Sequence, residues 1–453
     1  MEKRVKKIFV CSKCDAQFLK WFGQCPECGG WGTIEEKEIK VQNSKSKFEN
    51  LSEVAETINF EKVKIESYPK IKTKIEELDR VLGGGIVPGS LILLGGEPGI
   101  GKSTLVLQIA EKISKQISNS VLYISGEESA EQVKMRIDRL NISAKNLKFL
   151  GETNIETICA TIKKEKPSLA IIDSIQTTFS SQIPSEPGSV TQVKISTAKL
   201  LEIAKKEKIP ILITAHVTKE GIIAGPKTLE HLVDTVLYLE GDPYHQFRLL
   251  KTAKNRFGST NEIGVFEMKE NGLIEVKNPS EAFLSERGEE NPGSVIAGIL
   301  AGGRSFLVEV QALVAKTSFG YPQRKAIGLD LNRVQLLTAV LLRRLNLPLN
   351  NYDIHLNVVG GIKVEEPAID LAVCLAIVSA YKNKAINSDL VVFGEVGLAG
   401  EIRPVFHEEK RIKEAERLGF KKIIKPISKS KVKTQRIKII EVKDLKEAIN
   451  YCF

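Results

Sequence analysis

Short apolar runs recur through the middle of the chain, and most of them end at a polar or acidic residue. Runs of this length between turn residues are typical of buried strands. After the first run, residues 103–117 carry apolar side chains at helical spacing, which predicts a helix directly after a strand. The alternation of strands and helices predicts an α/β core. The strand runs are residues 91–94, 121–124, 169–173, 211–216 and 247–250.

The last third of the chain has a different pattern. Residues 306–314 predict a strand, and the periodicity of residues 331–345 and 367–381 predicts two helices, as in an α+β domain. Polar stretches rich in lysine, or in glutamate and glycine, separate the parts as linkers. The predicted boundaries are a cysteine-containing finger at 1–34, a linker at 35–58, the α/β domain at 59–278, a linker at 279–292 and the α+β domain at 293–453.

The loop after the first strand matches the phosphate-binding pattern G-x-x-x-x-G-K-[ST]. Its glycines let backbone N–H groups close around phosphates, Lys102 can reach the β and γ oxygens, and Ser103 offers a hydroxyl to Mg²⁺. A glycine-rich turn without a ligand is the alternative, but a helix N-terminus favours a bound anion. We predict a nucleoside triphosphate with Mg²⁺. The loop comprises Gly96, Glu97, Pro98, Gly99, Ile100, Gly101, Lys102, Ser103 and Thr104.

Acidic residues at the ends of later strands complete the predicted site. Asp173 ends the third run, where a carboxylate can hold the water shell of Mg²⁺. Glu127 follows the second run and can orient or deprotonate the attacking water. Alternatively, Glu127 and Glu128 are only first-turn acids of the next helix. His216 ends the fourth run, where it either senses the γ-phosphate or is a satisfied group at the edge of the core.

The N-terminal residues contain two Cys-x-x-Cys pairs separated by ten residues. Four thiolates at this spacing can close a tetrahedral zinc site. A segment of about 35 residues needs such a cross-link to stay folded, because its apolar core is too small to stabilise it alone. Disulfides are the alternative, but no apolar secretory segment follows Met1, which favours a reducing compartment. The predicted Zn²⁺ ligands are Cys11, Cys14, Cys25 and Cys28.

The order of these motifs resembles that of a known family. The phosphate loop, the segments YISGEES, AIIDS and ITAHVTKEG, and the block KNRFG at residues 254–258 are similar to the RecA-type ATPase of the bacterial RadA (Sms) recombination and repair proteins. The N-terminal finger also resembles the finger of that family. The resemblance implies an ATPase that works between subunits, in which Lys254 and Arg256 reach the neighbour's nucleotide or couple it to DNA.

The residues of that block also suggest two roles that do not depend on the resemblance. A Lys and an Arg on a loop after the strand at residues 247–250 could stabilise a developing phosphoryl charge, or they could form a solvated turn.

The same resemblance implies partners and assembly. It implies that the protein binds single-stranded and branched DNA and has the RecA recombinase as a partner. It also implies a homo-oligomeric ring, most simply a hexamer, in the bacterial cytoplasm near the nucleoid. ATP is also inferred from the family, since the chain lacks an Asn-Lys-x-Asp guanine-recognition motif.

The C-terminal domain resembles the proteolytic domain of Lon proteases, as the corresponding domain of RadA proteins does. Where Lon proteases carry a nucleophilic serine after a Gly-Pro step, this chain has Ala368 in the segment VEEPAID. Alanine cannot form an acyl intermediate. The activating lysine would fall close to Glu409, with Lys410 one residue away. We therefore predict a non-proteolytic scaffold for assembly and DNA binding.

The net charge of +10 indicates a polyanionic partner, and its placement matters. Residues 421–440 hold eight basic residues and no acid. This density could neutralise phosphates of a nucleic acid, or the residues could form an ordinary solvated surface. Loops after the third and fourth runs resemble those that approach DNA in RecA-like proteins, although ordinary mobile surface loops have the same composition. No apolar run approaches the ~18 residues that cross a membrane. The candidate DNA contacts are Lys219, Lys227, Lys429, Lys431 and Lys433.

These features predict a DNA-stimulated ATPase that moves along or remodels recombination intermediates, with Lys102, Asp173 and Glu127 as its catalytic residues. Two alternatives stay open. One is an ATP-dependent protease of the Lon type, which Ala368 disfavours. The other is a nucleotide-switched DNA-binding scaffold without motor activity, which slow turnover and tight retention of ATP would reveal.

Overall fold

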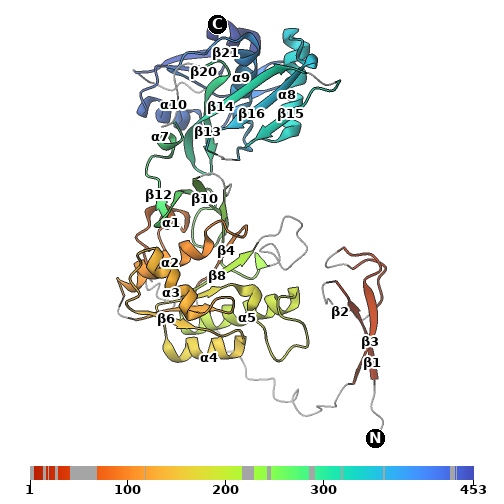
Figure 1. Ribbon diagram of the computed structural model, residues 1–453, viewed down its shortest axis with the longest axis vertical. Helices are drawn as coiled ribbons and strands as arrows, with labels where there is room; N and C mark the ends of the chain where they lie inside the picture. Colours follow the sequence, from red (N-terminus) through yellow and green to blue (C-terminus); the bar gives the residue numbers. More distant parts are fainter. Residues whose placement is uncertain are drawn as a thin grey trace, which may run out of the picture.

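The computed structural model describes residues 5–13, 17–18, 20–25, 29–40, 69–117, 119–216, 229–241, 246–284, 291–317, 320–360, 363–428, 434 and 436–453. These residues form a three-stranded N-terminal finger, an α/β domain on a nine-stranded sheet and a C-terminal domain on a seven-stranded sheet (Figure 1). The predicted α/β core and α+β C-terminal domain are both present. Among the described helices, none combines the length and the apolar character needed to cross a membrane.

The sheet of the α/β domain has the strand order β12-β11-β10-β9-β4-β8-β7-β5-β6. From β9 to β6 all neighbours are parallel, whereas β10, β11 and β12 form an antiparallel extension at one end. Strands β4, β5 and β7 are buried throughout, which explains their continuous apolar sequence. The bounds are β4 Leu91–Gly96, β5 Val121–Ser125, β6 Leu147–Leu150, β7 Leu169–Asp173, β8 Ile211–His216, β9 Thr235–Glu240, β10 Phe247–Asn255, β11 Ile263–Lys269 and β12 Gly272–Glu275.

Helices cover both faces of this sheet (Figure 1). Helices α1, α2 and α3 share a buried cluster with Leu94 and Tyr123, and α4 and α5 share another with Leu93 and Ile124. Successive strand residues point to opposite faces, so each central strand contributes to two cores. The bounds are α1 Glu76–Val81, α2 Lys102–Ser114, α3 Ala130–Arg139, α4 Ile155–Glu165 and α5 Val190–Glu207.

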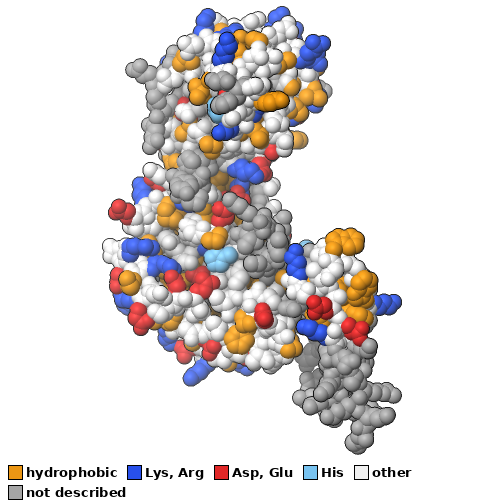
Figure 2. Space-filling model, turned by 45° about the vertical axis from the view of Figure 1, so that its right-hand side comes forward, with side chains coloured by type: hydrophobic (Ala, Val, Ile, Leu, Met, Phe, Trp, Pro, Cys, Tyr) orange, Lys and Arg blue, Asp and Glu red, His pale blue; other side chains and the backbone are white. Residues whose placement is uncertain are grey.

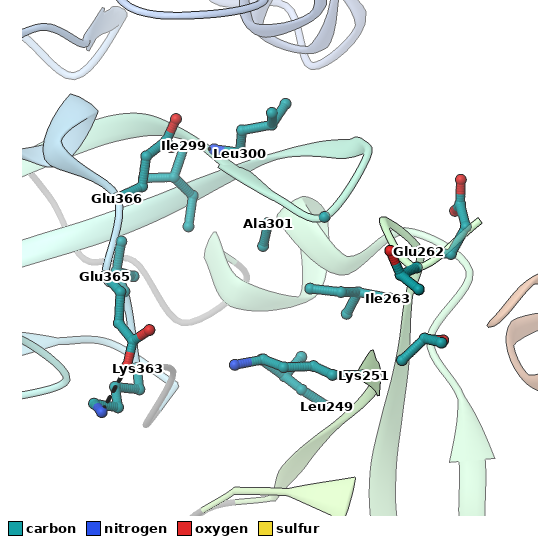
Figure 3. Close-up of a pocket in the computed structure, with 14 residues that line it drawn as sticks. Leu249, Lys251, Glu262, Ile263, Ile299, Leu300, Ala301, Lys363, Glu365 and Glu366 are labelled. Carbon is teal, nitrogen blue, oxygen red and sulfur yellow. Dashed lines mark hydrogen bonds and ion pairs between the residues drawn. The ribbon is translucent and has the colours of Figure 1, made fainter. Parts of the chain in front are cut away.

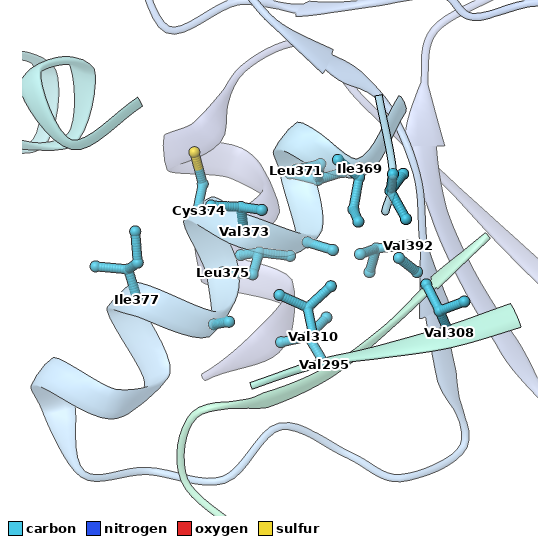
Figure 4. Close-up of a cluster of buried hydrophobic side chains, with 14 of the residues drawn as sticks. Val295, Val308, Val310, Ile369, Leu371, Val373, Cys374, Leu375, Ile377 and Val392 are labelled. Carbon is cyan, nitrogen blue, oxygen red and sulfur yellow. The ribbon is translucent and has the colours of Figure 1, made fainter. Parts of the chain in front are cut away.

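The C-terminal sheet has the strand order β15-β16-β14-β13-β17-β20-β21. Helix α9 lies against β13 and β14, and Leu371 and Leu375 share its core with Val295 and Val310 (Figure 4). Helices α8 and α11 belong to the same core, whereas α10 packs on the other face. The bounds are β13 Ser294–Ala301, β14 Arg304–Lys316, β15 Arg324–Ile327, α8 Leu331–Leu345, β16 Tyr352–Val358, α9 Asp370–Lys382, β17 Leu390–Val392, β18 Glu395–Val396, β19 Ile402–Arg403, α10 Glu408–Arg417, β20 Lys422–Pro426, β21 Lys438–Val442 and α11 Leu445–Cys452.

Some elements begin or end at other residues than the sequence pattern predicts. The helix expected at 367–381 starts as a 3₁₀ turn at Pro367–Ile369 before α9 begins. In the finger, β1 (Val5–Cys11) pairs antiparallel with β2 (Gln17–Phe18) and with β3 (Ile34–Lys40). Strand β3 therefore runs into the predicted linker, because backbone pairing with β1 forms a strand from a charged sequence that has no apolar alternation.

The C-terminal domain packs directly on the antiparallel extension of the α/β sheet (Figure 1). Leu249 and Val265 of β10 and β11 belong to the same buried cluster as the C-terminal core. At the same junction, Arg304 Nη1 lies 3.2 Å from both carboxylate oxygens of Glu77 in α1. A cavity of about 340 Å³ opens between β10 and residues 363–366 (Figure 3). The two domains thus share a continuous apolar contact.

The predicted linker at 279–292 begins with ordered structure. Pro279–Leu284 form helix α7. Phe283 is buried in the C-terminal core, and Ser280 Oγ donates a hydrogen bond of 2.6 Å to Glu414 Oε1. The acidic residues that suggested a linker lie mostly at 285–290, outside the described residues.

Two arginines of α10 offer a matched test of the C-terminal fold. The side chain of Arg411 is 0% exposed and donates to Glu366 and to the carbonyl of Gly298. The side chain of Arg417 is 44% exposed and pairs with Glu414 at 2.9 Å. We expect Arg411→Met to lower the free energy of unfolding by about 3 kcal/mol, because Glu366 loses its partner inside the domain. Arg417→Met should cost less than about 1 kcal/mol.

Guanidinium chloride unfolding of both variants beside the wild type measures the two costs. Equal losses in the two variants would contradict the importance of the buried pair.

Candidate nucleotide-binding site

The phosphate loop, Asp173, Glu127 and His216 lie at one edge of the parallel sheet. Parallel strands end at a common edge, and loops at that edge are the usual ligand-binding place in such sheets. The register pairs Gly96 with His216 and Ser125 with Asp173. The phosphate loop follows Gly96, and Glu127 follows Ser125. The residues predicted for phosphate binding, metal binding and water activation therefore lie around one loop.

The phosphate loop needs glycine at several positions. Gly99 and Gly101 have φ angles of 76° and 114°, a region that other residues rarely adopt. A Cβ on Gly96 would lie 2.7 Å from the carbonyl oxygen of Leu239. At Gly99, apart from the glycine and its two chain neighbours, no atom of the described residues lies within 4 Å of the Cβ position. An open loop at the N-terminus of α2 fits a phosphate group.

Lys102 is held inside the loop. Its residue is 4% exposed, and Nζ donates to the carbonyl oxygens of Gly96 at 2.9 Å and Glu97 at 3.0 Å. Nζ also lies 3.2 Å from Nδ1 of His216. Burial lowers the pKa of Lys102, and the charge of Asp173 opposes that shift. Burial and the charge of Lys102 lower the pKa of His216, so its imidazole is neutral at pH 7 and Nδ1 accepts the hydrogen bond.

Asp173 is oriented by hydroxyl groups from both neighbouring strands. Tyr123 Oη of β5 donates to Oδ2 at 2.6 Å, and Thr214 Oγ1 of β8 donates to Oδ1 at 2.6 Å. Burial and the charge of Asp173 raise the pKa of Tyr123 well above its usual value, so the phenol stays a donor. Each carboxylate oxygen keeps a further lone pair. Ser103 and Asp173 are thus suited to hold Mg²⁺ and its water shell.

Glu127 and Glu128 have different environments. Glu127 Oε1 accepts a hydrogen bond of 2.6 Å from Ser174 Oγ. Glu128 pairs with Arg136 of α3 through both carboxylate oxygens. Helix α3 begins after its N-cap Ser129, so both glutamates precede the helix. The alternative that they are first-turn acids does not fit, and of the two, Glu127 is the one whose carboxylate is not held by an arginine.

The block at residues 254–258 lies at the opposite edge of the sheet. Strand β10 continues through Asn255, so Lys254 lies in a strand instead of the predicted loop. The strand continues because its pairing with β9 resumes after a bulge. Thr235 of β9 pairs with Asn255 and also with Ile92 near the start of β4. The block therefore lies level with the start of β4, on the far side of β9, whereas the phosphate loop follows the end of β4.

Contacts within the chain fix the basic residues of this block. Lys254 Nζ donates to the carbonyl of Glu230 at 2.6 Å. The Arg256 side chain is 57% exposed, and its Nη1 lies 3.6 Å from Oδ1 of Asp234. Asp234 is buried and also accepts from Lys205 Nζ at 2.7 Å. Arg256 is therefore exposed to solvent while the buried Asp234 holds its guanidinium in place.

Half of the predicted zinc ligands are described. Cys11 and Cys25 are buried in one small cluster with Ile34. Two cysteines in one small core fit part of the donor set of a zinc site. Figure 2 shows apolar side chains gathered on the finger surface, where Trp21 and Trp31 are exposed. The predicted residues outside the described part of the chain are Cys14, Cys28, Lys219, Lys227, Lys429, Lys431 and Lys433.

Not every basic residue of the segment 421–440 lies at the protein surface. Lys425 is buried, and its Nζ lies 3.0 Å from Glu408 and 2.8 Å from Glu441. Lys421 pairs with Asp389 at 2.8 Å. Lys425 is therefore not part of the predicted basic face, because its side chain neutralises two carboxylates of its own domain.

The residues at the positions expected for the Lon serine and its lysine lie in the described part of the C-terminal domain. Ala368 is buried in the 3₁₀ turn before α9. Lys410 Nζ donates to the carbonyl of Gly303 at 2.7 Å. Glu409 pairs with Lys413 on its own helix. Ala368 offers no hydroxyl or thiol at this position.

Sequence reasoning missed several residues that shape the nucleotide site. Tyr123 and Thr214 belong to apolar strand runs, and Ser174 follows Asp173. Their signal was a hydroxyl within or beside a buried strand. Arg248 is a charged residue in the buried strand β10, and its Nε donates to the carbonyl of Ile100 in the phosphate loop at 3.2 Å. An arginine inside an apolar run could have pointed to that contact.

Comparison with known protein families agrees with the three parts of the chain. A model described as AAA domain matches residues 55–221. A model described as rubredoxin metal binding domain matches residues 9–36. A model described as subunit ChlI of Mg-chelatase matches residues 319–429. The predicted cysteine finger, ATPase core and Lon-like C-terminal domain are confirmed.

Curated relatives match over almost the full length. The chain is 50% identical over 451 residues to the DNA repair protein RadA of Bacillus subtilis, which covers 98% of both chains. It is 46% identical over 458 residues to the DNA repair protein RadA of Pseudomonas aeruginosa, with 99% of both covered. For the Listeria monocytogenes protein of that name, identity is 49% over 424 residues, 94% of this chain and 92% of the relative. With such identity added to a finger, a phosphate-loop domain and a Lon-like domain, the chain belongs to the RadA family of DNA repair proteins.

Proposed function

We propose that this chain is a DNA-stimulated ATPase of homologous recombination and repair, and that it remodels branched intermediates as a ring-shaped homo-oligomer, a hexamer. The observation that carries the proposal is the convergence of Lys102, Asp173 and Glu127 around the phosphate loop. The coulombic influence of Asp173 and Glu127 on Lys102 indicates that the three charges act on one another. This is the minimum set for binding a triphosphate, holding its metal and activating water.

Each of these groups would have a separate role in ATP hydrolysis. The Lys102 ammonium exchanges the carbonyls of Gly96 and Glu97 for phosphate oxygens. Ser103 and Asp173 would hold Mg²⁺ and its water shell, and the ion would supply charge neutralisation for the phosphates. Glu127, oriented by Ser174, takes the proton of the attacking water. The water oxygen bonds to the γ-phosphorus as the bond from that phosphorus to the β–γ bridging oxygen breaks. Phosphate is released, and the nucleoside diphosphate stays in the backbone cradle of the loop.

The position of Lys254 and Arg256 supports action on a neighbouring subunit. At ~3.3 Å per residue, Ile92 lies about 13 Å along β4 from Gly96, and the block lies level with Ile92 on the far side of β9. That distance is too long for Arg256 to reach the phosphate loop of its own chain. The exposed guanidinium, anchored on Asp234, is available to a neighbour's nucleotide. We propose that active sites are completed between subunits.

The C-terminal domain is proposed as a scaffold for assembly and DNA binding. The buried methyl of Ala368 leaves no nucleophile, which argues against the Lon-type protease alternative. Lys219, Lys227, Lys429, Lys431 and Lys433 remain the proposed DNA contacts, and single-stranded and branched DNA and the RecA recombinase the proposed partners. Zn²⁺ on Cys11, Cys14, Cys25 and Cys28 would stabilise the finger. The proposed compartment is the bacterial cytoplasm, at the nucleoid.

Lys102→Ala is expected to abolish ATP hydrolysis, because no other side chain of the loop neutralises the γ-phosphate. Steady-state turnover with and without single-stranded DNA measures the effect. Lys112→Ala, on the exposed face of the same helix α2, is the matched control and should keep normal turnover. Retention of more than about a tenth of wild-type turnover in Lys102→Ala would count against the site, given the several kcal/mol that such charge stabilisation supplies.

Glu127→Gln should preserve ATP binding and slow turnover by about 100-fold or more, because the amide cannot take a proton from water. Glu128→Gln should stay near wild type, since Glu128 serves Arg136. Binding and single-turnover rates of both variants separate the roles. Loss of ATP binding in Glu127→Gln would make Glu127 structural. Tight ATP retention without turnover in the wild type would favour the scaffold alternative.

Neutralising Lys429, Lys431 and Lys433 together with glutamine should weaken DNA binding about equally for all sequences. The log–log salt slope should fall by roughly 0.9 for each duplex phosphate contact removed. ATP hydrolysis without DNA should not change. Neutralising the exposed lysines at the end of α4, Lys163, Lys164 and Lys166, removes the same charge as a control. Unchanged affinity and slope in the first variant would leave these residues as a solvated surface.

A further inference from the structure

The antiparallel strands β10 and β11 form a wall between the phosphate loop and the C-terminal domain. Leu250 and Phe266 point to the core shared with α2. Leu249 and Val265, one residue away on each strand, point to the core of the C-terminal domain. Because successive strand residues face opposite sides, neighbouring residues of β10 touch different domains.

Arg248 is on the phosphate-loop side of this wall. It is 4% exposed. Its Nε donates to the carbonyl of Ile100 at 3.2 Å, and its Nη1 donates to the carbonyl of Phe247 at 2.9 Å. Ile100 itself is buried and lies two residues before Lys102. A buried guanidinium is costly unless it is hydrogen-bonded, so this contact fixes the backbone of the loop.

Two further contacts bind the same region to the wall. The amide of Gln108 in α2 donates to the carbonyl of Leu273 at 3.0 Å and accepts from its N–H at 3.0 Å. A Cβ on Gly101 would lie 2.6 Å from Met268 Cε. The loop and its helix therefore rest on β11 and β12 as well as on β10.

The adjacent residue of β10 contacts the other domain. The ring of Phe247 lies 4.9 Å from that of Phe283 in α7, edge to face, and Phe283 lies 6.3 Å from Phe306 in β14. A Cβ on Gly360 would lie within 3.6 Å of both Phe247 and Phe283. Rings in direct contact pass a displacement from one side chain to the next, and none of these three rings lines the cavity at the same junction.

We propose that Arg248 is a positioning residue for nucleotide binding, and that through Phe247 it ties the phosphate loop to helix α7 of the C-terminal domain. The inference rests on the proposed ATPase function. Arg248 acts through the Ile100 carbonyl: the hydrogen bond holds the loop in the shape that exposes its N–H groups and Lys102 to phosphates. A change in the loop on nucleotide binding moves β10, and Phe247 carries that movement to Phe283.

The affinity test uses full-length Arg248→Met and Arg248→Lys, with a non-hydrolysable ATP analogue and Mg²⁺. Arg248→Met removes the donor while keeping a chain of similar length, and the analogue should bind about tenfold more weakly, as expected for one lost hydrogen bond from a charged donor. Arg248→Lys restores a donor and should recover most of the affinity. In turnover, KM should rise more than kcat falls. Equal affinity of folded Arg248→Met and wild type would overturn the proposal.

Hydrogen exchange distinguishes positioning from general stabilisation. In the wild type, the saturating analogue should slow exchange in the phosphate loop and in α7. In Arg248→Met, saturation should protect the loop but no longer α7. Equal protection of α7 in both proteins, or none in the wild type, would overturn the tie between the domains. If Arg248→Met fails to fold, the same comparison is made with Arg248→Lys, where α7 protection should persist and its loss would overturn the proposal. A wild type that does not bind the analogue at all would instead reject the proposed function.

Discussion

The parallel pairing of β4, β8, β7 and β5 is the constraint on which the site depends. It brings residues that are distant in sequence to one edge: Gly96 lies opposite His216, and Ser125 opposite Asp173. Each strand is buried on both faces, so a shift of register would place apolar side chains in the wrong core. The energy that holds the catalytic geometry therefore comes from the apolar strands and not from the polar groups themselves.

Charged groups are tolerated in this interior because each has a specific partner. Lys102 is held by loop carbonyls, Asp173 by two hydroxyls, and Arg248 by carbonyls of Ile100 and Phe247. The C-terminal domain repeats the principle with Lys425 between two glutamates. Such groups specify one arrangement, since any alternative would bury a charge without a partner. In the α/β domain the same restriction produces a loop that is ready for phosphate.

The sequence predicted those parts whose cause is local. Strands such as Leu169–Asp173 are continuous apolar runs, and the phosphate loop is one segment with a fixed spacing, so both could be found. Asp173 and Glu127 followed from their places after strands. Tyr123, Thr214 and Ser174 were missed because their role depends on strand order, which puts β5 and β8 on either side of β7. Strand β3 and helix α7 were missed because pairing and packing partners far along the chain form them from sequences typical of linkers.

The shared wall has a consequence for dividing the protein. A fragment that ends at residue 278 would keep every residue of the phosphate loop and its catalytic acids. It would also expose Leu249, Ile263 and Val265 to water and leave Glu77 without Arg304. An apolar strip on an uncovered sheet face is a common cause of self-association. The isolated ATPase part would therefore be a different molecule in solution, and its oligomeric state would reflect the cut surface instead of the natural assembly.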